Sequence, residues 1–474
     1  MATRNLVPIT GELRSINPAT GELLATIPMD SDAALAAKLA RAAQCFPAWR
    51  QTSFAQRSAL MLRAAEVLLA RKDEFARLMT LEMGKTLRSA VQEVEKSAWG
   101  CRFYAEHAEA FLRDEPLPSS AARAFLRYQP LGVVLAVMPW NFPFWQLFRF
   151  AAPALMAGNV ALLKHASNVP QSAVAIEEVF RAAGFPAGSF QTLLIDSRRV
   201  AQVIADPRVR AVTLTGSVGA GSSVAATAGK YVKKTVLELG GSDPFIVMPS
   251  ADLDHAMRTG VNSRILNNGQ TCTAAKRFFV HEGIYAEFSS RFVARVRQLR
   301  VGDPLDDATD VGPLATADGA AELERQVART VALGGRLLTG GHRLPGPGNF
   351  FAPTVLADVP PGSPAHDEEM FGPVATLFRV HNLGEALELA NASNFGLGSS
   401  CWTSDAREQE IFIERIDAGM AFVNGMVASD PRLPFGGVKD SGYGRELSSF
   451  GIREFTNAKT VCLCPGQSAA NITE

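Results

Sequence analysis

Short apolar runs alternate with longer amphipathic segments over the stretch from residue 124 to residue 280. The runs typical of strands are 124–129, 132–138, 160–163, 192–195, 211–214, 244–247 and 278–280. The segments typical of helices are 172–183, 198–205, 218–228 and 253–266. Strands that alternate with helices pair in parallel through right-handed crossovers, as in nucleotide-binding domains. The alternation therefore predicts an α/β fold.

The flanking regions have other patterns. Residues 30–113 show helical spacing of apolar residues throughout, and a second alternating region runs from about 235 to 424. The tail at 455–463 has the composition of a strand. We expect this tail and the strand at 124–129 to form an arm that pairs with another subunit.

Composition excludes several classes of partner. The 474 residues are 47% hydrophobic and 20% charged, and their formal net charge is zero. This balance argues against nucleic acid and against a membrane surface as partners. The six cysteines are scattered, which predicts a protein of the reducing cytoplasm. Neither they nor the seven histidines have the spacing of a metal site, so we expect no metal.

One cysteine stands out from the other five. Cys272 follows the polar, glycine-containing residues 267–271 at the end of a predicted helix, where a thiol meets a substrate rather than a core. Glu238 lies among apolar and glycine residues, so burial should raise its pKa toward neutrality. A nucleophilic thiol with a glutamate as general base is the interpretation we favour.

Three further motifs each allow two interpretations. The glycine-rich residues 215–221 follow a predicted strand and open a helix, which favours a phosphate site or a tight turn. Asn141 stands between two prolines. Its amide either forms an oxyanion hole with the Cys272 N–H or satisfies its own turn. Lys164 follows the strand at 160–163 and is a candidate contact for a cofactor, or a solvated lysine.

Taken in order, the motifs resemble those of the aldehyde dehydrogenase superfamily. They are 139–143, Lys164, 216–217, 238–241, 269–272, 369–373 and 434–437. Residues 239–245 and the length of the chain are similar to the bacterial succinate-semialdehyde dehydrogenases within that superfamily.

The resemblance implies a reaction. Cys272 attacks the aldehyde, Asn141 and the Cys272 N–H hold the oxyanion, and hydride leaves for a nicotinamide. Glu238 then activates the water that hydrolyses the thioester. The residues implied for the cofactor are Trp140, Lys164, Ser167, Gly216, Ser217, Leu239, Glu369 and Phe371. Those implied for the substrate are Trp145, Arg149, Ser429, Arg432 and Phe435.

It also implies an architecture. A Rossmann-type cofactor domain would comprise residues 1–115 and 132–237, and an α/β catalytic domain residues 238–440. Residues 116–131 and 441–474 would form a small β oligomerisation arm, which implies a homodimer or homotetramer.

The choice of cofactor depends on one position. Members of the superfamily that prefer NAD often carry a glutamate three residues after the cofactor lysine, where this chain has Ser167. A serine does not repel a 2′-phosphate and can hydrogen-bond to it. NADP is therefore the favoured cofactor, with NAD as the alternative.

The choice of substrate depends on Arg149, which resembles an arginine that binds the distal carboxylate of semialdehydes. A second arginine of some such enzymes is replaced by Leu266, and Ser429 and Arg432 are candidates to compensate. Alternatively, Arg149 pairs with an internal carboxylate, and the substrate is another small aldehyde. A coenzyme A acylating enzyme is disfavoured by Glu238. A catalytically silent binding protein is disfavoured because Cys272, Glu238 and Asn141 are all present.

Overall fold

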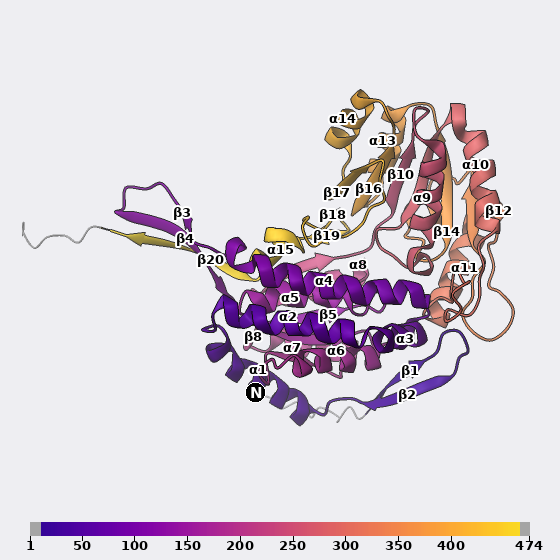
Figure 1. The fold of residues 1–474 in the computed structure, drawn as a ribbon. Helices are drawn as coiled ribbons and strands as arrows, with labels where there is room; N and C mark the ends of the chain where they lie inside the picture. Colours follow the sequence, from indigo (N-terminus) through magenta and orange to yellow (C-terminus); the bar gives the residue numbers. More distant parts are fainter. Residues whose placement is uncertain (1–10, 465–474) are drawn as a thin grey trace, which may run out of the picture.

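The computed structural model describes residues 11–464 and shows two lobes and a projecting arm (Figure 1). Each lobe is built on a mainly parallel β-sheet with helices packed against it. This architecture confirms the predicted α/β class. The ends of the predicted first domain and of the arm, 1–10 and 465–474, lie outside the described residues.

The first lobe contains a six-stranded sheet of order β19-β9-β8-β5-β6-β7, in which only β19 is antiparallel to its neighbour. The strands are β5 (Val133–Met138), β6 (Val160–His165), β7 (Phe190–Thr192), β8 (Val209–Thr215), β9 (Lys234–Glu238) and β19 (Gly442–Tyr443). The helices are α1 (Asp32–Trp49), α2 (Phe54–Ala70), α3 (Lys72–Met83), α4 (Leu87–Phe111), α5 (Trp145–Met156), α6 (Pro170–Ala182), α7 (Val200–Ala205) and α8 (Val218–Lys230). Helices α2 to α6 contribute to one large hydrophobic core, and α7 and α8 to a second.

The second lobe contains a seven-stranded sheet of order β12-β13-β14-β11-β10-β16-β17. The strands are β10 (Asp243–Val247), β11 (Ala275–His281), β12 (Arg336–Thr339), β13 (Thr354–Ala357), β14 (Val374–Val380), β16 (Gly398–Trp402) and β17 (Met420–Val423). The helices are α9 (Leu253–Ile265), α10 (Glu282–Arg297), α11 (Ala317–Ala332), α12 (Pro364–Asp367), α13 (Leu383–Asn391) and α14 (Ala406–Arg415). Strand β9 ends at Glu238 and β10 begins at Asp243, so the motif at 238–241 joins the two sheets.

The arm is a three-stranded sheet of β3 (Glu115–Pro116), β4 (Arg123–Pro130) and β20 (Thr456–Leu463). Strand β20 pairs antiparallel with β4 along its whole length, and the sheet projects away from both lobes (Figure 1). The two segments expected to form an arm therefore do pair. Helix α15 (Ser448–Glu454) leads into β20, whereas β19, which we grouped with the arm, joins the sheet of the first lobe.

The strand predicted at 192–195 was misplaced. Strand β7 ends at Thr192, although Leu193 and Ile195 are almost fully buried. The Leu193 N–H still donates to the Leu163 carbonyl of β6, so pairing in the sheet ends there, and the rest of the apolar run reflects burial in the core. An N-terminal hairpin of β1 (Glu12–Ile16) and β2 (Leu23–Pro28) was not predicted from the sequence.

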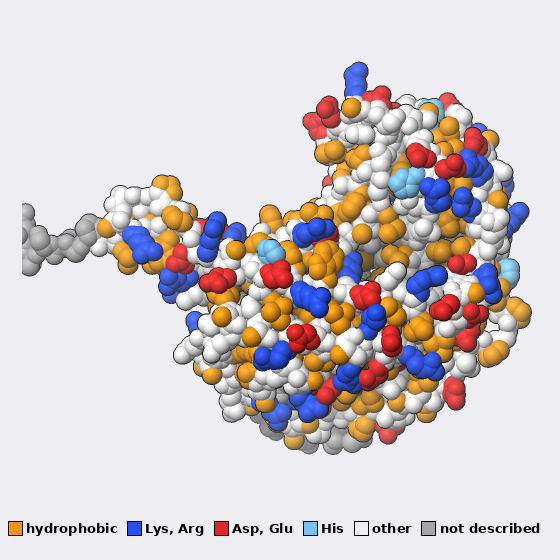
Figure 2. Space-filling model, viewed as in Figure 1, with side chains coloured by type: hydrophobic (Ala, Val, Ile, Leu, Met, Phe, Trp, Pro, Cys, Tyr) orange, Lys and Arg blue, Asp and Glu red, His pale blue; other side chains and the backbone are white. Residues whose placement is uncertain are grey.

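Two surface properties bear on partners. Acidic and basic side chains are interspersed over the face shown in Figure 2. Within residues 11–464, no helix combines the length and the apolar character needed to cross a membrane.

Candidate active site

Two cavities meet at Cys272. The first, of about 230 Å³, is lined by Lys96, Trp145, Ser429 and Phe435 among others, and we call it the Lys96 cavity. The second, of about 260 Å³, is lined by Trp140, Gly216, Ser217, Leu239, Glu369 and Phe371 among others, and we call it the Glu369 cavity. Cys272 and Gln146 line both. One thiol can therefore meet a ligand in either cavity.

The loop before Cys272 is held in an uncommon backbone conformation. Asn267, Asn268 and Gly269 all have positive φ, of 55°, 59° and 76°. Asparagine and glycine adopt this region most readily. At Gly269 a Cβ would come within 2.4 Å of the Gly372 backbone, so both φ and space require glycine. The Asn-Asn-Gly sequence thus places the cysteine at the end of a tightly packed turn.

Asparagine side chains connect this loop to the rest of the site. Asn267 Nδ2 donates to the Asn141 carbonyl at 2.7 Å, and Asn141 Nδ2 donates to the Gln270 carbonyl at 3.1 Å. Asn141 therefore does not satisfy its own turn, and its second amide hydrogen stays available. The Cys272 N–H has no acceptor within the described residues. Two donors beside the thiol are what an oxyanion hole requires.

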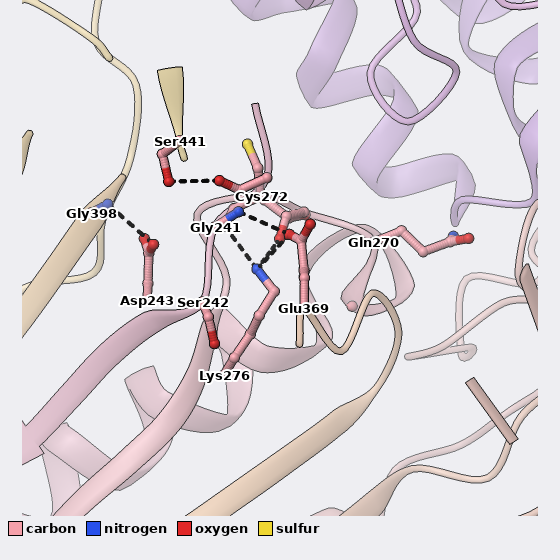
Figure 3. A network of polar contacts seen from close by, with 12 residues as sticks. Gly241, Ser242, Asp243, Gln270, Cys272, Lys276, Glu369, Gly398 and Ser441 are labelled. Carbon is pink, nitrogen blue, oxygen red and sulfur yellow. Dashed lines mark hydrogen bonds and ion pairs between the residues drawn. The ribbon is translucent and has the colours of Figure 1, made fainter. Parts of the chain in front are cut away.

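A buried lysine joins the nucleophile loop to the Glu369 cavity (Figure 3). Lys276 Nζ donates to the carbonyls of Thr271 (2.9 Å) and Cys272 (2.7 Å), and it lies 3.2 Å from a carboxylate oxygen of Glu369. The Gly241 N–H donates to the same carboxylate at 3.1 Å. The negative charge of Glu369 is thus balanced from within the protein.

Burial dominates the ionisation of the thiol. It raises the pKa of Cys272 to about 12, although the positive charges of Arg149 and Lys276 act in the opposite direction. The resting thiol is therefore protonated at neutral pH, and attack on a carbonyl needs a base.

Glu238 at the end of β9 is the candidate base, and it is buried outside the lining of both cavities. Neither carboxylate oxygen has a hydrogen-bond partner within the described residues. Gly436 leaves room for it, because a Cβ there would lie 2.7 Å from Glu238 Oε1. Burial, and then the negative charge of Glu446, raise the pKa of Glu238 well above its ordinary value, in the direction expected from the sequence.

Arg149 on α5 lines the Lys96 cavity, but its guanidinium is already paired. It forms a buried ion pair with Glu446 and lies 4.2 Å from the centre of the Phe435 ring. This geometry favours the second interpretation of Arg149, in which it pairs with an internal carboxylate. Its role toward a substrate carboxylate stays a prediction.

The structure brings together most of the residues implied for substrate and cofactor. Trp145, Ser429 and Phe435 line one cavity, and six of the eight cofactor candidates line the other. Lys164 is buried at the end of β6, and Ser167 is exposed just beyond it. Neither lines the Glu369 cavity. The Ser217 hydroxyl accepts from the Ala220 N–H at 3.3 Å and so caps helix α8.

Arg432 is the exception among the substrate candidates. Its side chain is 67% exposed and pairs with Asp430 at 2.6 Å, and it lies outside the lining of the Lys96 cavity. The Asp430 carboxylate two residues away offers the guanidinium a local partner at the surface. The structure therefore does not support compensation by Arg432 for the arginine replaced by Leu266.

Sequence reasoning missed four residues that the structure places in or beside the site: Lys96, Gln146, Lys276 and Glu446. Lys96 and Gln146 lie on helices α4 and α5. A polar residue of an amphipathic helix is normally expected to face solvent, so the sequence gives no sign that these two line a cavity. For Glu446, the available signal is its place at the end of the glycine-rich segment 441–446, since loops of this kind often line pockets.

The chain is similar to known proteins over nearly its whole length. A model of the aldehyde dehydrogenase family matches residues 8–461. The chain is 57% identical to a succinate-semialdehyde dehydrogenase, NADP(+), from Mycobacterium avium, over 96% of this chain and 98% of that one. It is 58% identical to such a protein from Mycobacterium tuberculosis, over 95% and 99%. The solved structure of succinic semialdehyde dehydrogenase from Streptococcus pyogenes in complex with NADP+ superposes with a TM-score of 0.94. It is 39% identical, and the match covers 96% of this chain and 100% of that one.

These findings confirm the resemblance drawn from the motifs, including the predicted aldehyde-dehydrogenase-like fold. The ordered motifs, the matched model and the structural superposition all extend over nearly the whole chain. The chain belongs to the aldehyde dehydrogenase family.

Proposed function

We propose that the protein oxidises succinate semialdehyde to succinate with NADP. The observation that carries the proposal is the placement of one partly buried thiol, Cys272, on the boundary between a cavity with cationic side chains and a cavity bearing the cofactor motifs. The names of the relatives from two Mycobacterium species support both the substrate and the cofactor.

The residues of the chain have distinct tasks in this reaction. The Cys272 thiolate adds to the aldehyde carbon, and the second amide hydrogen of Asn141 and the Cys272 N–H stabilise the oxyanion. Glu238 takes the proton from the thiol and later from the water that hydrolyses the thioester. For this its side chain rotates from its place beside Gly436 toward Cys272. A raised pKa suits a base that both accepts and releases a proton near neutral pH.

The Glu369 cavity fits a dinucleotide. Gly216 and Ser217 stand between β8 and the first turn of α8, where backbone N–H groups favour a phosphate. The Glu369 carboxylate suits ribose hydroxyls, and Trp140 and Phe371 supply apolar walls. When bound, the cofactor supplies the hydride acceptor.

The preference for NADP is carried by Lys164 and Ser167. Lys164 is 6% exposed and makes no ion pair within the described residues, and burial lowers its pKa. A buried ammonium without a carboxylate partner favours an anion such as a 2′-phosphate. Ser167 adds a hydroxyl without adding negative charge.

We also propose that the protein is a cytoplasmic homodimer or homotetramer with the predicted domain boundaries, except that β19 belongs to the first lobe rather than to the arm. The projecting arm of β3, β4 and β20 offers a surface for assembly, and all six cysteines are free, as expected in a reducing compartment.

The proposed function is tested by steady-state kinetics. Purified enzyme is assayed with succinate semialdehyde, glutarate semialdehyde and butanal, each with NADP and with NAD, by the absorbance of the reduced nicotinamide. We expect the highest kcat/KM for succinate semialdehyde with NADP, by about tenfold or more over butanal. Equal values for butanal would indicate an enzyme of neutral aldehydes, and equal values with NAD would contradict the roles of Lys164 and Ser167. No reduction with any pair would indicate a binding protein.

A further inference from the structure

Lys96 places an ammonium group in the substrate-side cavity. It lies on helix α4, and its side chain is mostly buried against Trp145, with Nζ 4.8 Å from the centre of the indole ring. Nζ donates a hydrogen bond of 2.9 Å to the Ser429 hydroxyl. A lysine of α4 that served only solubility would extend its ammonium into bulk water.

The other charged groups that line this cavity already have partners. Glu93 forms a buried ion pair with Lys85 and accepts from the N–H groups of Phe144 and Trp145 at 2.9 and 3.0 Å. Arg149 is paired with Glu446. Within residues 11–464, no carboxylate lies within ion-pair distance of Lys96. The lining therefore carries one unbalanced positive charge.

Ser429 complements this charge. Its hydroxyl oxygen accepts from Trp145 Nε1 and from Lys96 Nζ, both at 2.9 Å. A hydroxyl has two lone pairs and one hydrogen, so when both lone pairs are used the hydrogen remains for an acceptor. Lys96 has ammonium hydrogens left as well. Two donors in contact with each other match the two oxygens of one carboxylate.

We propose that Lys96, together with Ser429, binds the distal carboxylate of the semialdehyde and determines the specificity for it, while Arg149 holds Glu446. This inference rests on the proposed function and names the residues of that site that bind the charged carboxylate of the substrate. It assigns Lys96 to substrate binding, not to a chemical step.

The ionisation of Lys96 gives the proposal a pH signature. Burial lowers the pKa of Lys96 to about 8, and the positive charge of Arg149 on α5 acts in the same direction. Asp430, in the loop after β17, and Glu93 on α4 oppose both effects. Above pH 8 the free enzyme loses the ammonium charge, so KM for succinate semialdehyde should rise by up to about tenfold per pH unit. KM for butanal should stay flat over the same range.

The test uses three variants of the full chain. Lys96→Met removes the charge and keeps an apolar stem, Lys96→Arg keeps a charge that does not titrate in this range, and Arg432→Gln removes an exposed cation outside the cavity. KM and kcat are measured for succinate semialdehyde and for butanal, which has the same four carbons and no carboxylate.

We expect Lys96→Met to raise KM for succinate semialdehyde about 10- to 100-fold, from the strength of a charged hydrogen bond, and to change KM for butanal less than about twofold. Lys96→Arg should retain most of the binding and abolish the rise of KM above pH 8, and Arg432→Gln should match the parent. Equal changes for both aldehydes would overturn the proposal.

The outcomes separate this proposal from the proposed function. Failure of the parent enzyme to oxidise succinate semialdehyde would contradict the function itself. Efficient oxidation by the parent together with unaltered discrimination in Lys96→Met would contradict only the role of Lys96. Turnover of butanal shows that a variant is folded.

Discussion

The two cavities that share Cys272 differ in how their charges are balanced. The Lys96 cavity carries an ammonium that lacks a carboxylate partner within the described residues, whereas in the Glu369 cavity the carboxylate is held by Lys276 and the Gly241 N–H. A buried charge without a partner is costly, so the first cavity is completed by an anionic ligand. The second needs no ionic ligand at Glu369. We therefore expect the Lys96 cavity to select the aldehyde by its charge. Charge-based selection between NADP and NAD should depend instead on Lys164, which lies outside the lining of the Glu369 cavity.

Replacement of Cys272 should abolish turnover, because its thiol lies where the two cavities meet. Cys272→Ser should lower kcat for every aldehyde by a factor on the order of 10⁴ or more, because no other nucleophile lies at their junction. Steady-state assays check this, with Cys45→Ala as the matched control, since Cys45 packs against the helical core away from both cavities. Residual turnover near that of the parent enzyme would refute the assignment.

Glu238→Gln should lower kcat about 100- to 10,000-fold, and equally for succinate semialdehyde and butanal, because the base serves a step common to both. The raised pKa of Glu238 sets the sign of the pH dependence. In the parent, kcat should rise with pH as the carboxylate ionises, and this limb should be lost in the variant. A loss confined to one aldehyde would place Glu238 in substrate binding instead.

Glu369→Gln tests whether the Glu369 cavity binds the cofactor without affecting the choice of aldehyde. We expect kcat/KM for NADP to fall about tenfold or more, since a charged acceptor for ribose hydroxyls is lost and Lys276 is left without its carboxylate. The ratio of kcat/KM between succinate semialdehyde and butanal should not change. A change in that ratio would contradict the prediction, because it would show that Glu369 also affects binding of the aldehyde.

Arg149→Met should affect both aldehydes alike, because Arg149 is paired with Glu446 beside Glu238. We expect about a tenfold loss of kcat from the unpaired carboxylate and the disturbed base. Steady-state measurements of kcat and KM with succinate semialdehyde and with butanal check this loss. A rise of KM for succinate semialdehyde alone would restore Arg149 as the carboxylate anchor.

Two serines give the smallest and most selective effects. Ser429→Ala should raise KM for succinate semialdehyde about fivefold and leave KM for NADP unchanged, since one hydrogen bond is lost. Ser167→Ala should have the reverse pattern, with KM for NADP raised by a similar factor. Identical profiles for the two variants would contradict the division between cavities.

The candidate residues that the structure brings together as the sequence predicted are those whose local pattern is tied to their position. Cys272 follows a turn of positive φ, which asparagine and glycine adopt most readily, and Asn141 is fixed between prolines. Parallel strands such as β6 are recognisable because both faces are buried and the run is continuously apolar.

Other features depend on contacts that no local pattern records. The run at 192–195 is apolar because it packs into the core, and only its first two residues pair with β6. Lys96 and Arg432 each have a carboxylate within two residues in the sequence, so their local patterns are similar. In the structure, Lys96 lines a cavity, whereas Arg432 pairs with Asp430 at the surface. The partner of Arg149 is nearly three hundred residues away in sequence, so only the fold reveals it.

The most direct test of the two-cavity account compares Lys96→Met with Lys164→Met across two aldehydes and two cofactors. Lys96→Met should reduce the preference for succinate semialdehyde over butanal by about 10- to 100-fold and leave the preference for NADP over NAD intact. Lys164→Met should do the opposite. If either variant changed both preferences to the same extent, the account of two independently charged cavities around one thiol would be contradicted.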